Sequence, residues 1–185
     1  MKPWQQLPFQ YSIHMQDKPG GELNHFSFLA DLEKGNQDPR PEILKGLQKY
    51  LGDSGSIVAY NAGFETARLN EMTDAFLEYR DWWENNVNPR MVDLLKPFRS
   101  FAFYDSSQCG SSSIKVVLPS LVGSGYEDLD ISEGGSASAE YWRISIQSNE
   151  PDDVDRIREA LEKYCAMDTE AEALIVDRLK SIVML

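Results

Sequence analysis

Cysteine, positive charge and long apolar runs are all scarce in this chain of 185 residues. Its two cysteines, Cys109 and Cys165, are too few for a disulfide framework, which favours a reducing compartment. No apolar run approaches the roughly 20 residues that cross a bilayer, and residues 1–12 lack the apolar stretch of a signal peptide. We therefore expect a cytoplasmic protein with no membrane partner.

Basic residues are outnumbered by acidic ones. Eighteen lysines and arginines stand against thirty aspartates and glutamates, which gives a net charge of −12. This balance argues against an autonomous nucleic-acid binder that works through salt-dependent contacts. It does not exclude an enzyme that holds a polyanion through bound metal ions. Hydrophobic residues make up 42% of the chain, enough for one folded domain over residues 1–185.

The order of the predicted elements defines an α/β domain. Residues 7–15 and 22–29 are predicted as two strands, paired through a turn at 18–21 that contains Pro-Gly-Gly. Residues 90–103 carry no clear pattern, and 123–150, rich in Gly, Ser and acid, predict an irregular excursion. The other predicted elements are a helix from 39 to 51, a strand at 56–60 and a helix at 64–80. A capped helix at 114–121, interrupted by Pro119, and a final helical region at 151–183, with or without a break, follow. This order favours a mixed sheet flanked by helices.

The final predicted helix carries an acidic residue where its apolar face should continue. Its apolar stripe, at steps of three and four, consists of Leu161, Tyr164, Cys165, Ala171, Ile175, Leu179 and Ile182. Asp168 fills the gap in that stripe, although an unpaired charge in an apolar neighbourhood is costly. Two interpretations stay open: the carboxylate is hydrogen-bonded to a neighbouring helix or lysine, or it is a ligand in a functional site.

A second carboxylate stands in a comparable place. Glu65 lies one turn before the apolar stripe of helix 64–80, and a first-turn glutamate is also favoured simply by the helix dipole. The strand 56–60 leads into it, however, and α/β proteins place their sites at the carboxyl edge of a strand. Because Mg²⁺ and Mn²⁺ prefer oxygen ligands, Glu65 and Asp168 together predict a site for one of these ions.

Two short segments resemble motifs of the DEDD exonucleases, which are ribonuclease-H-like proofreading nucleases. Tyr60-Asn-Ala-Gly-Phe-Glu65 resembles their second motif, and Tyr164-Cys-Ala-Met-Asp168 resembles their third motif in its tyrosine form. Val92-Asp-Leu94 lies between them, where the family often has an Asp-Leu pair. Nearly the whole chain also resembles an uncharacterised bacterial family whose nuclease-like domain forms the trailing part of longer proteins; that likeness rests on residues 7–12, 38–40 and 110–121.

The resemblance implies a fold, a chemistry and a set of roles. The fold would be a ribonuclease-H-like mixed sheet flanked by helices. Members hold two divalent ions, Mg²⁺ or Mn²⁺, with four acidic residues and hydrolyse phosphodiesters of DNA or RNA from the 3′ end. Glu65 and Asp168 would be metal ligands, and Tyr164 would orient the attacking water.

The sequence departs from this pattern at the first motif, an Asp-x-Glu on the opening strand. That strand should precede the one containing Phe9 and Tyr11, and residues 1–8 do not contain it. The early Asp-x-Glu at Asp31 and Glu33 comes too late, because two further strands do not fit between it and the helix at 39–51. We interpret Asp31 and Glu33 as solvated turn residues. A second, milder departure is Glu65, since the family more often has Asp there.

The missing motif leads to two competing expectations. One is a metal-dependent 3′–5′ exonuclease domain that is a piece of a longer protein. Its activity would be impaired in this chain, because the first strand and its acidic motif are missing. The alternative is a non-catalytic nuclease-like module used for binding or structure. In either case an exposed sheet edge invites pairing with a second copy or with another part of the parent protein, so we predict a tendency to form homodimers.

Other candidate residues predict less. His14 and His25 lack a third ligand of fitting spacing and make a poor zinc site. Trp82 and Trp83 could stack nucleobases, but packing is the simpler interpretation. Lys115, near the start of the helix at 114–121, could face a phosphate, although one lysine does not define a site.

Overall fold

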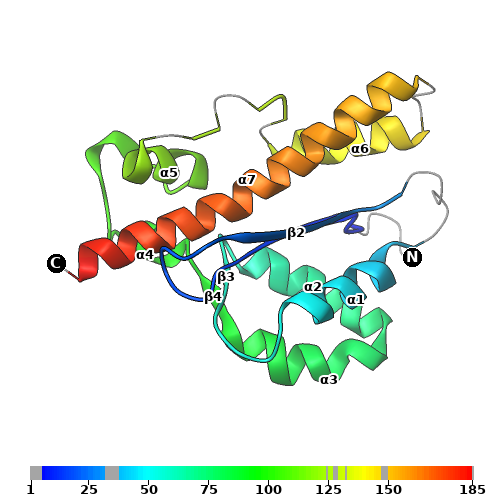
Figure 1. Ribbon diagram of the computed structural model, residues 1–185, viewed down its shortest axis with the longest axis horizontal. Coiled ribbons are helices and arrows are strands. Elements are labelled where there is room, and N and C mark those ends of the chain that lie inside the picture. Colours follow the sequence, from blue (N-terminus) through cyan, green and yellow to red (C-terminus); the bar gives the residue numbers. More distant parts are fainter. Residues whose placement is uncertain are drawn as a thin grey trace.

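One long helix organises the computed structural model, which describes residues 6–31, 38–123, 125–126, 129–131, 133–146 and 150–184. This helix, α7 (Pro151–Val183), runs along the molecule. Helices α5 (Ile114–Val122) and α6 (Gly134–Ile146) both pack against it, and so do the strands. Helix α5 lies on the side of α7 opposite the strands, and α6 lies at the other end of α7 (Figure 1). It is unbroken over 33 residues. None of the helices in the described part of the chain combines the length and apolar character needed to cross a membrane.

The predicted hairpin is confirmed. Strands β1 (Gln10–Met15) and β2 (Asn24–Leu29) pair antiparallel, with Ser12 opposite Ser27. In the turn the Gly21 N–H donates to the Lys18 carbonyl at 2.9 Å, and Gly20 has a φ of 70°, which glycine adopts without strain. Side chains alternate across β1 as the pleat requires: Tyr11 packs against α1, while Gln10 and Ser12 hydrogen-bond to α7.

A second, parallel pair of strands forms the edge from which the candidate site is built. The predicted strand at 56–60 is observed as β3 (Ile57–Ala59), and it pairs with β4 (Met91–Asp93). Helix α2 (Gly63–Ala75) lies between them in the chain. Sequence reasoning missed β4 because it has three residues, too few to display an alternating pattern.

The structure contains two separate two-stranded sheets in its described residues, rather than the single mixed sheet expected. The α/β class is confirmed, and both sheets occupy the same layer. Helix α7 contacts β1, β2 and β3, whereas a core cluster on the other side joins both sheets to α1 (Arg40–Tyr50) and α2. No strand among the described residues bridges β1 and β3, which leaves the layer in two halves.

The predicted helix at 64–80 needs correction. The helix expected at 64–80 ends at Ala75, because Phe76 leaves the helical conformation at φ −126° and ψ 79°. Short turns then follow: 3₁₀ turns at Leu77–Tyr79 and Asn88–Arg90, α3 (Arg80–Trp82) and a π turn at Trp83–Val87. Trp83 lies in the core with 1% of its surface exposed and donates to Asn70 Oδ1 at 2.6 Å, which confirms packing as its role.

The region expected to be an irregular excursion contains helix α6 instead. Its buried Ala137 and Ile144 lie seven residues apart, two helical turns, and pack with Leu161 of α7 in one core cluster. The glycines and serines of this stretch concealed that spacing. Helix α5 begins at the predicted residue, but the predicted interruption at Pro119 is wrong, since the helix continues through it to Val122. The predicted cap is also wrong, because the Ser113 side chain makes no capping hydrogen bond.

Candidate functional site

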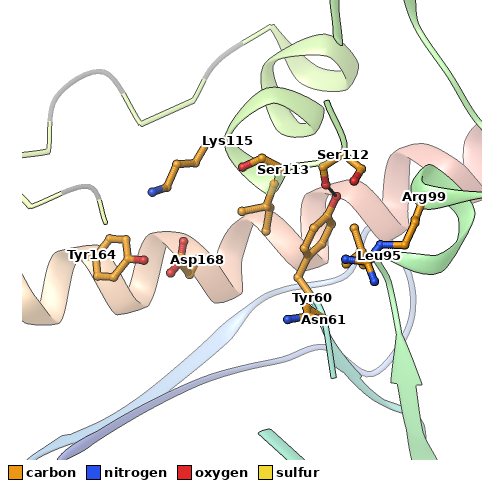
Figure 2. Close-up of a pocket in the computed structure, with 10 residues that line it drawn as sticks. Tyr60, Asn61, Leu95, Arg99, Ser112, Ser113, Lys115, Tyr164 and Asp168 are labelled. Carbon is orange, nitrogen blue, oxygen red and sulfur yellow. Dashed lines mark hydrogen bonds between the residues drawn. The ribbon is translucent and has the colours of Figure 1, made fainter. Parts of the chain in front are cut away.

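A cavity of about 370 Å³ opens between α7, α5 and the end of β3 (Figure 2). Four parts of the chain contribute to it, because α7, α5, the turn after β3 and helix α4 (Lys96–Arg99) meet there. Its polar and aromatic lining consists of Tyr60, Asn61, Arg99, Ser112, Ser113, Lys115, Tyr164 and Asp168. The cavity thus brings the start of the segment 60–65 together with Tyr164 and Asp168.

Asp168 lies where the buried face of α7 passes from one core cluster to another. Leu161 belongs to the first cluster and Ala171 to the second. The Tyr126 hydroxyl donates to Asp168 Oδ1 at 2.7 Å. Burial raises the pKa of the Asp168 carboxyl, while hydrogen bonds from Tyr126 and Tyr164 and the charge of Lys115 act against that rise. The carboxylate is therefore held by tyrosines rather than by an ion pair.

Tyr164 stands one turn before Asp168 and faces the same cavity. Burial raises the pKa of its hydroxyl, and the Asp168 charge raises it further, so the group stays protonated and can donate a hydrogen bond. The Nζ of Lys115 lies 5.9 Å from the centre of the tyrosine ring. A protonated hydroxyl, a carboxylate and an ammonium group thus share one end of the cavity.

Glu65 is close to this site but does not line the cavity. It lies in the first turn of α2, where its Oε2 is buried with no hydrogen-bond partner among the described residues. Burial raises the pKa of the Glu65 carboxyl, and the charge of Asp93 raises it too. An unpartnered buried carboxylate oxygen is costly, which is typical of a site that is completed by another group.

Glu172 is a carboxylate that sequence reasoning missed. It follows Asp168 by one turn of α7, and its Oε1 accepts a hydrogen bond from the Tyr60 N–H at 2.8 Å. Burial, with the charges of Glu65 and Asp168, raises the pKa of Glu172 to about 8. Glu172 therefore lies within electrostatic reach of both predicted ligands. The available signal was its position four residues after Asp168, on the same helical face.

Asp93 stabilises the turns at the ends of the two parallel strands. Its Oδ1 accepts hydrogen bonds from the Asn61 N–H at 3.1 Å and the Leu95 N–H at 3.0 Å. Asn61 has a left-handed φ of 69°, a conformation that asparagine tolerates better than most residues. Asp93 thus fixes the turn that carries Asn61 into the cavity.

The donor set is incomplete as a metal site. Carboxylate oxygens suit Mg²⁺ or Mn²⁺, and the orphaned Oε2 of Glu65 is a chemically fitting donor. Within the described ranges, however, no three His, Cys, Asp or Glu side chains are grouped so that they could hold a metal ion. These residues alone do not fit a divalent ion, and still less the pair of ions that the resemblance implies.

Other residues named in the sequence analysis do not line the cavity. The rings of His14 and His25 stack 4.4 Å apart, and His14 Nδ1 hydrogen-bonds to Thr169 at 2.8 Å, with no third ligand grouped around them among the described residues. Cys165 is half-buried, and burial raises the pKa of its thiol to about 12. Asp31 is exposed just after β2, as expected of a turn residue, whereas Glu33 lies outside the described residues.

Comparison with known proteins identifies the family but no activity. Residues 1–113 match the family described as a domain of unknown function, DUF2779. That match covers more than half of the chain, so the chain belongs to this family. It includes residues 60–65 and Asp93 but stops short of Tyr164 and Asp168. No curated protein and no solved structure matches the chain.

Proposed function

We propose that this chain contributes half of the active site of a metal-dependent 3′–5′ exonuclease acting on DNA or RNA. One observation carries the proposal: the Tyr164–Asp168 pair and the turn that begins the segment 60–65 line the same cavity. These two segments lie a hundred residues apart in the sequence, and each resembles a different motif of the DEDD nucleases.

The proposed fold is a ribonuclease-H-like sheet completed by a strand from outside the described residues. Both sheets already lie between α7 and the α1–α2 layer, and the described residues offer β1 and β3 no shared neighbour. A strand placed between β1 and β3 would join the two halves. An Asp-x-Glu on that strand would add two carboxylates to Glu65 and Asp168.

The completed donor set is the one that would take Mg²⁺ or Mn²⁺. Such ions activate water and stabilise the leaving oxygen of a phosphodiester. The residues of this chain have simpler tasks. Tyr126 and Tyr164 hold the Asp168 carboxylate in one orientation, and the protonated Tyr164 hydroxyl is left facing the cavity, where it can orient a water molecule.

The second candidate is a non-catalytic nuclease-like module. The incomplete donor set favours it, since the described carboxylates form no metal-binding group. So does the Tyr126 hydroxyl, which occupies Asp168 Oδ1. On this alternative the cavity binds a nucleic acid or a protein partner without cleaving it.

A nuclease assay on the longest natural polypeptide that contains this chain separates the two. With Mn²⁺ and 5′-labelled single-stranded DNA or RNA, the exonuclease proposal expects stepwise shortening from the 3′ end. Asp168→Ala and Glu65→Ala should abolish this activity, and Tyr164→Phe should lower it. The control variant Asp81→Ala, at an exposed position on α3, should leave the activity unchanged. Shortening that persists in Asp168→Ala contradicts the proposal, and no shortening by any of the proteins supports the module.

A further inference from the structure

We propose that the cavity beside Asp168 binds two successive backbone phosphates of a nucleic-acid strand, one through Lys115 and the next through Arg99. The choice of a nucleic-acid strand as ligand rests on the proposed function, whereas the capacity to bind phosphate rests on the cavity itself. Both side chains line the cavity, and they come from different helices, α5 and α4.

Lys115 places its charge at the Asp168 end of the cavity. Its ammonium group lies over the Tyr164 ring and lowers the pKa of Asp168 by its charge. No carboxylate among the described residues comes within ion-pair distance of it, although the chain has thirty acidic residues. A lysine in this position keeps its hydrogen-bonding capacity for an incoming anion.

Arg99 differs from the other arginines in the described part of the chain. Eight of the nine arginines donate hydrogen bonds from their guanidinium groups to acceptors there, and the Arg99 guanidinium donates none. Its charge nevertheless acts on the cavity: burial and the charge of Asp93 raise the pKa of the Tyr60 hydroxyl, and the charge of Arg99 acts against that rise. Arginine is well suited to bind a phosphate through two parallel hydrogen bonds.

The two cations lie at opposite ends of the cavity, with Ser112 and Ser113 between them (Figure 2). Ser113 precedes the first residue of α5 and lines the cavity, and its side chain makes no capping hydrogen bond to that helix. Serine hydroxyls and basic side chains are the usual protein contacts to phosphate oxygens. Two separated cations with hydroxyls between them suit an extended strand better than one isolated anion.

The local charge also differs in sign from that of the whole chain. Against a net charge of −12, the cavity lining has two basic residues and one acidic residue, Asp168. An anion that enters the cavity therefore meets two basic side chains there. A local pair of basic side chains is a physical reason for an acidic protein to bind a phosphate backbone at one defined place.

The test measures binding without metal. Calorimetric titrations of the chain in EDTA and low salt would use thymidine 5′-monophosphate and the 5′-phosphorylated thymidine dinucleotide. We expect Lys115→Ala to weaken the binding of both ligands by about tenfold or more, since each ligand loses a hydrogen bond to a charged group. Arg99→Ala should weaken only the dinucleotide, and Arg99→Lys should restore part of that loss.

The same experiment includes matched control variants and outcomes that would contradict the proposal. Lys45→Ala on α1 and Arg178→Ala on α7 remove one exposed charge each and should change neither affinity more than about twofold. Thermal melts check that each variant is folded. Two results would overturn the phosphate proposal even if the nuclease is active. One is wild-type affinity in the Lys115→Ala/Arg99→Ala double variant. The other is a loss of affinity in the Lys45 and Arg178 controls as large as in the Lys115 and Arg99 variants. Binding that follows the expected pattern, with no nuclease activity in the parent protein, would overturn only the exonuclease proposal.

Discussion

The Glu172 carboxylate accepts a 2.8 Å hydrogen bond from the Tyr60 N–H, which ties the buried face of α7 to the end of β3. The same carboxyl has its pKa raised to about 8 by burial, with the charges of Glu65 and Asp168 adding to the effect. Ionising it in the folded protein is therefore unfavourable, and the stability of the chain should depend on pH.

We predict that Glu172→Gln stabilises the protein at high pH. Because the folded pKa is raised, the folded state holds the proton that the unfolded state releases above about pH 4.5. Wild-type stability should fall as the pH rises from about 4.5 to about 8 and then level off. Glutamine keeps the acceptor without the charge, so the variant should be more stable at pH 9 by a few kcal/mol and nearly equal at pH 5. Urea unfolding at both pH values measures this difference.

The control for that prediction is Glu172→Ala, which removes the acceptor for the Tyr60 N–H as well as the charge. It should be less stable than Glu172→Gln at both pH values by about 1 kcal/mol, the usual net contribution of such a hydrogen bond. If the wild-type protein and Glu172→Gln had equal free energies of unfolding at pH 9, ionising Glu172 in the folded state would cost nothing, and the prediction would be wrong.

We predict that the two cysteines react at very different rates. Cys109 is exposed, whereas burial raises the pKa of the Cys165 thiol to about 12, with a further contribution from the Asp168 charge. Since the thiolate is the reactive form, iodoacetamide at pH 8 should alkylate Cys109 and leave Cys165 unmodified in the folded chain. Peptide mass spectrometry reads out both sites. Equal labelling of the two would contradict the buried position of Cys165 beside Asp168.

We predict that Gly46→Ala destabilises the packing of α1 on the hairpin. An added Cβ would lie 2.9 Å from two carbons of the Tyr11 ring, closer than atoms pack. The overpacking cost of about 1–3 kcal/mol should exceed the gain of up to about 1 kcal/mol in helix propensity. Tyr11→Phe removes the hydroxyl nearest to that Cβ, so the double variant should recover part of the loss in urea unfolding. Stabilisation by Gly46→Ala alone would contradict this packing.

The divided sheet leads to a prediction about association. Strands β1 and β3 each have a single strand partner in the described part of the chain, and an unpaired edge is a template for another strand. We expect the chain to dimerise as its concentration rises, which light scattering measures. A monodisperse monomer at high concentration would contradict this prediction without bearing on the fold.

Local signals predicted much of the fold. The hairpin, α1, α5 and α7 were predictable because turn residues and apolar periodicity act over a few residues. Strand β4 was missed because it has three residues, and helix α6 was missed because it begins with glycines and serine and has two buried positions seven residues apart. The interruption of the sheet was equally invisible, because strand pairing depends on contacts far apart in the sequence.

The candidate site shows the same limit. Asp168 could be found from the sequence because it interrupts an apolar stripe of one helix. Tyr126 and Arg99 could not, since each reaches the site through a contact that only the tertiary structure creates. Glu172 could have been found from its place one turn after Asp168, but its hydrogen bond to Tyr60 could not. Tyr126, for example, hydrogen-bonds to a residue 42 positions away.

The most direct test of the central claim compares the nuclease rate of this 185-residue chain with that of the longest natural polypeptide containing it. Both would be given Mn²⁺ and single-stranded DNA or RNA under identical conditions. Because the described carboxylates do not complete a metal site, we predict a rate near background for the short chain. The longer protein, if it carries an upstream Asp-x-Glu, should be active and lose that activity with Asp168→Ala. Robust digestion by the short chain, abolished by Asp168→Ala, would contradict the account of a half-site, and Asp31 and Glu33 would then be the first residues to substitute.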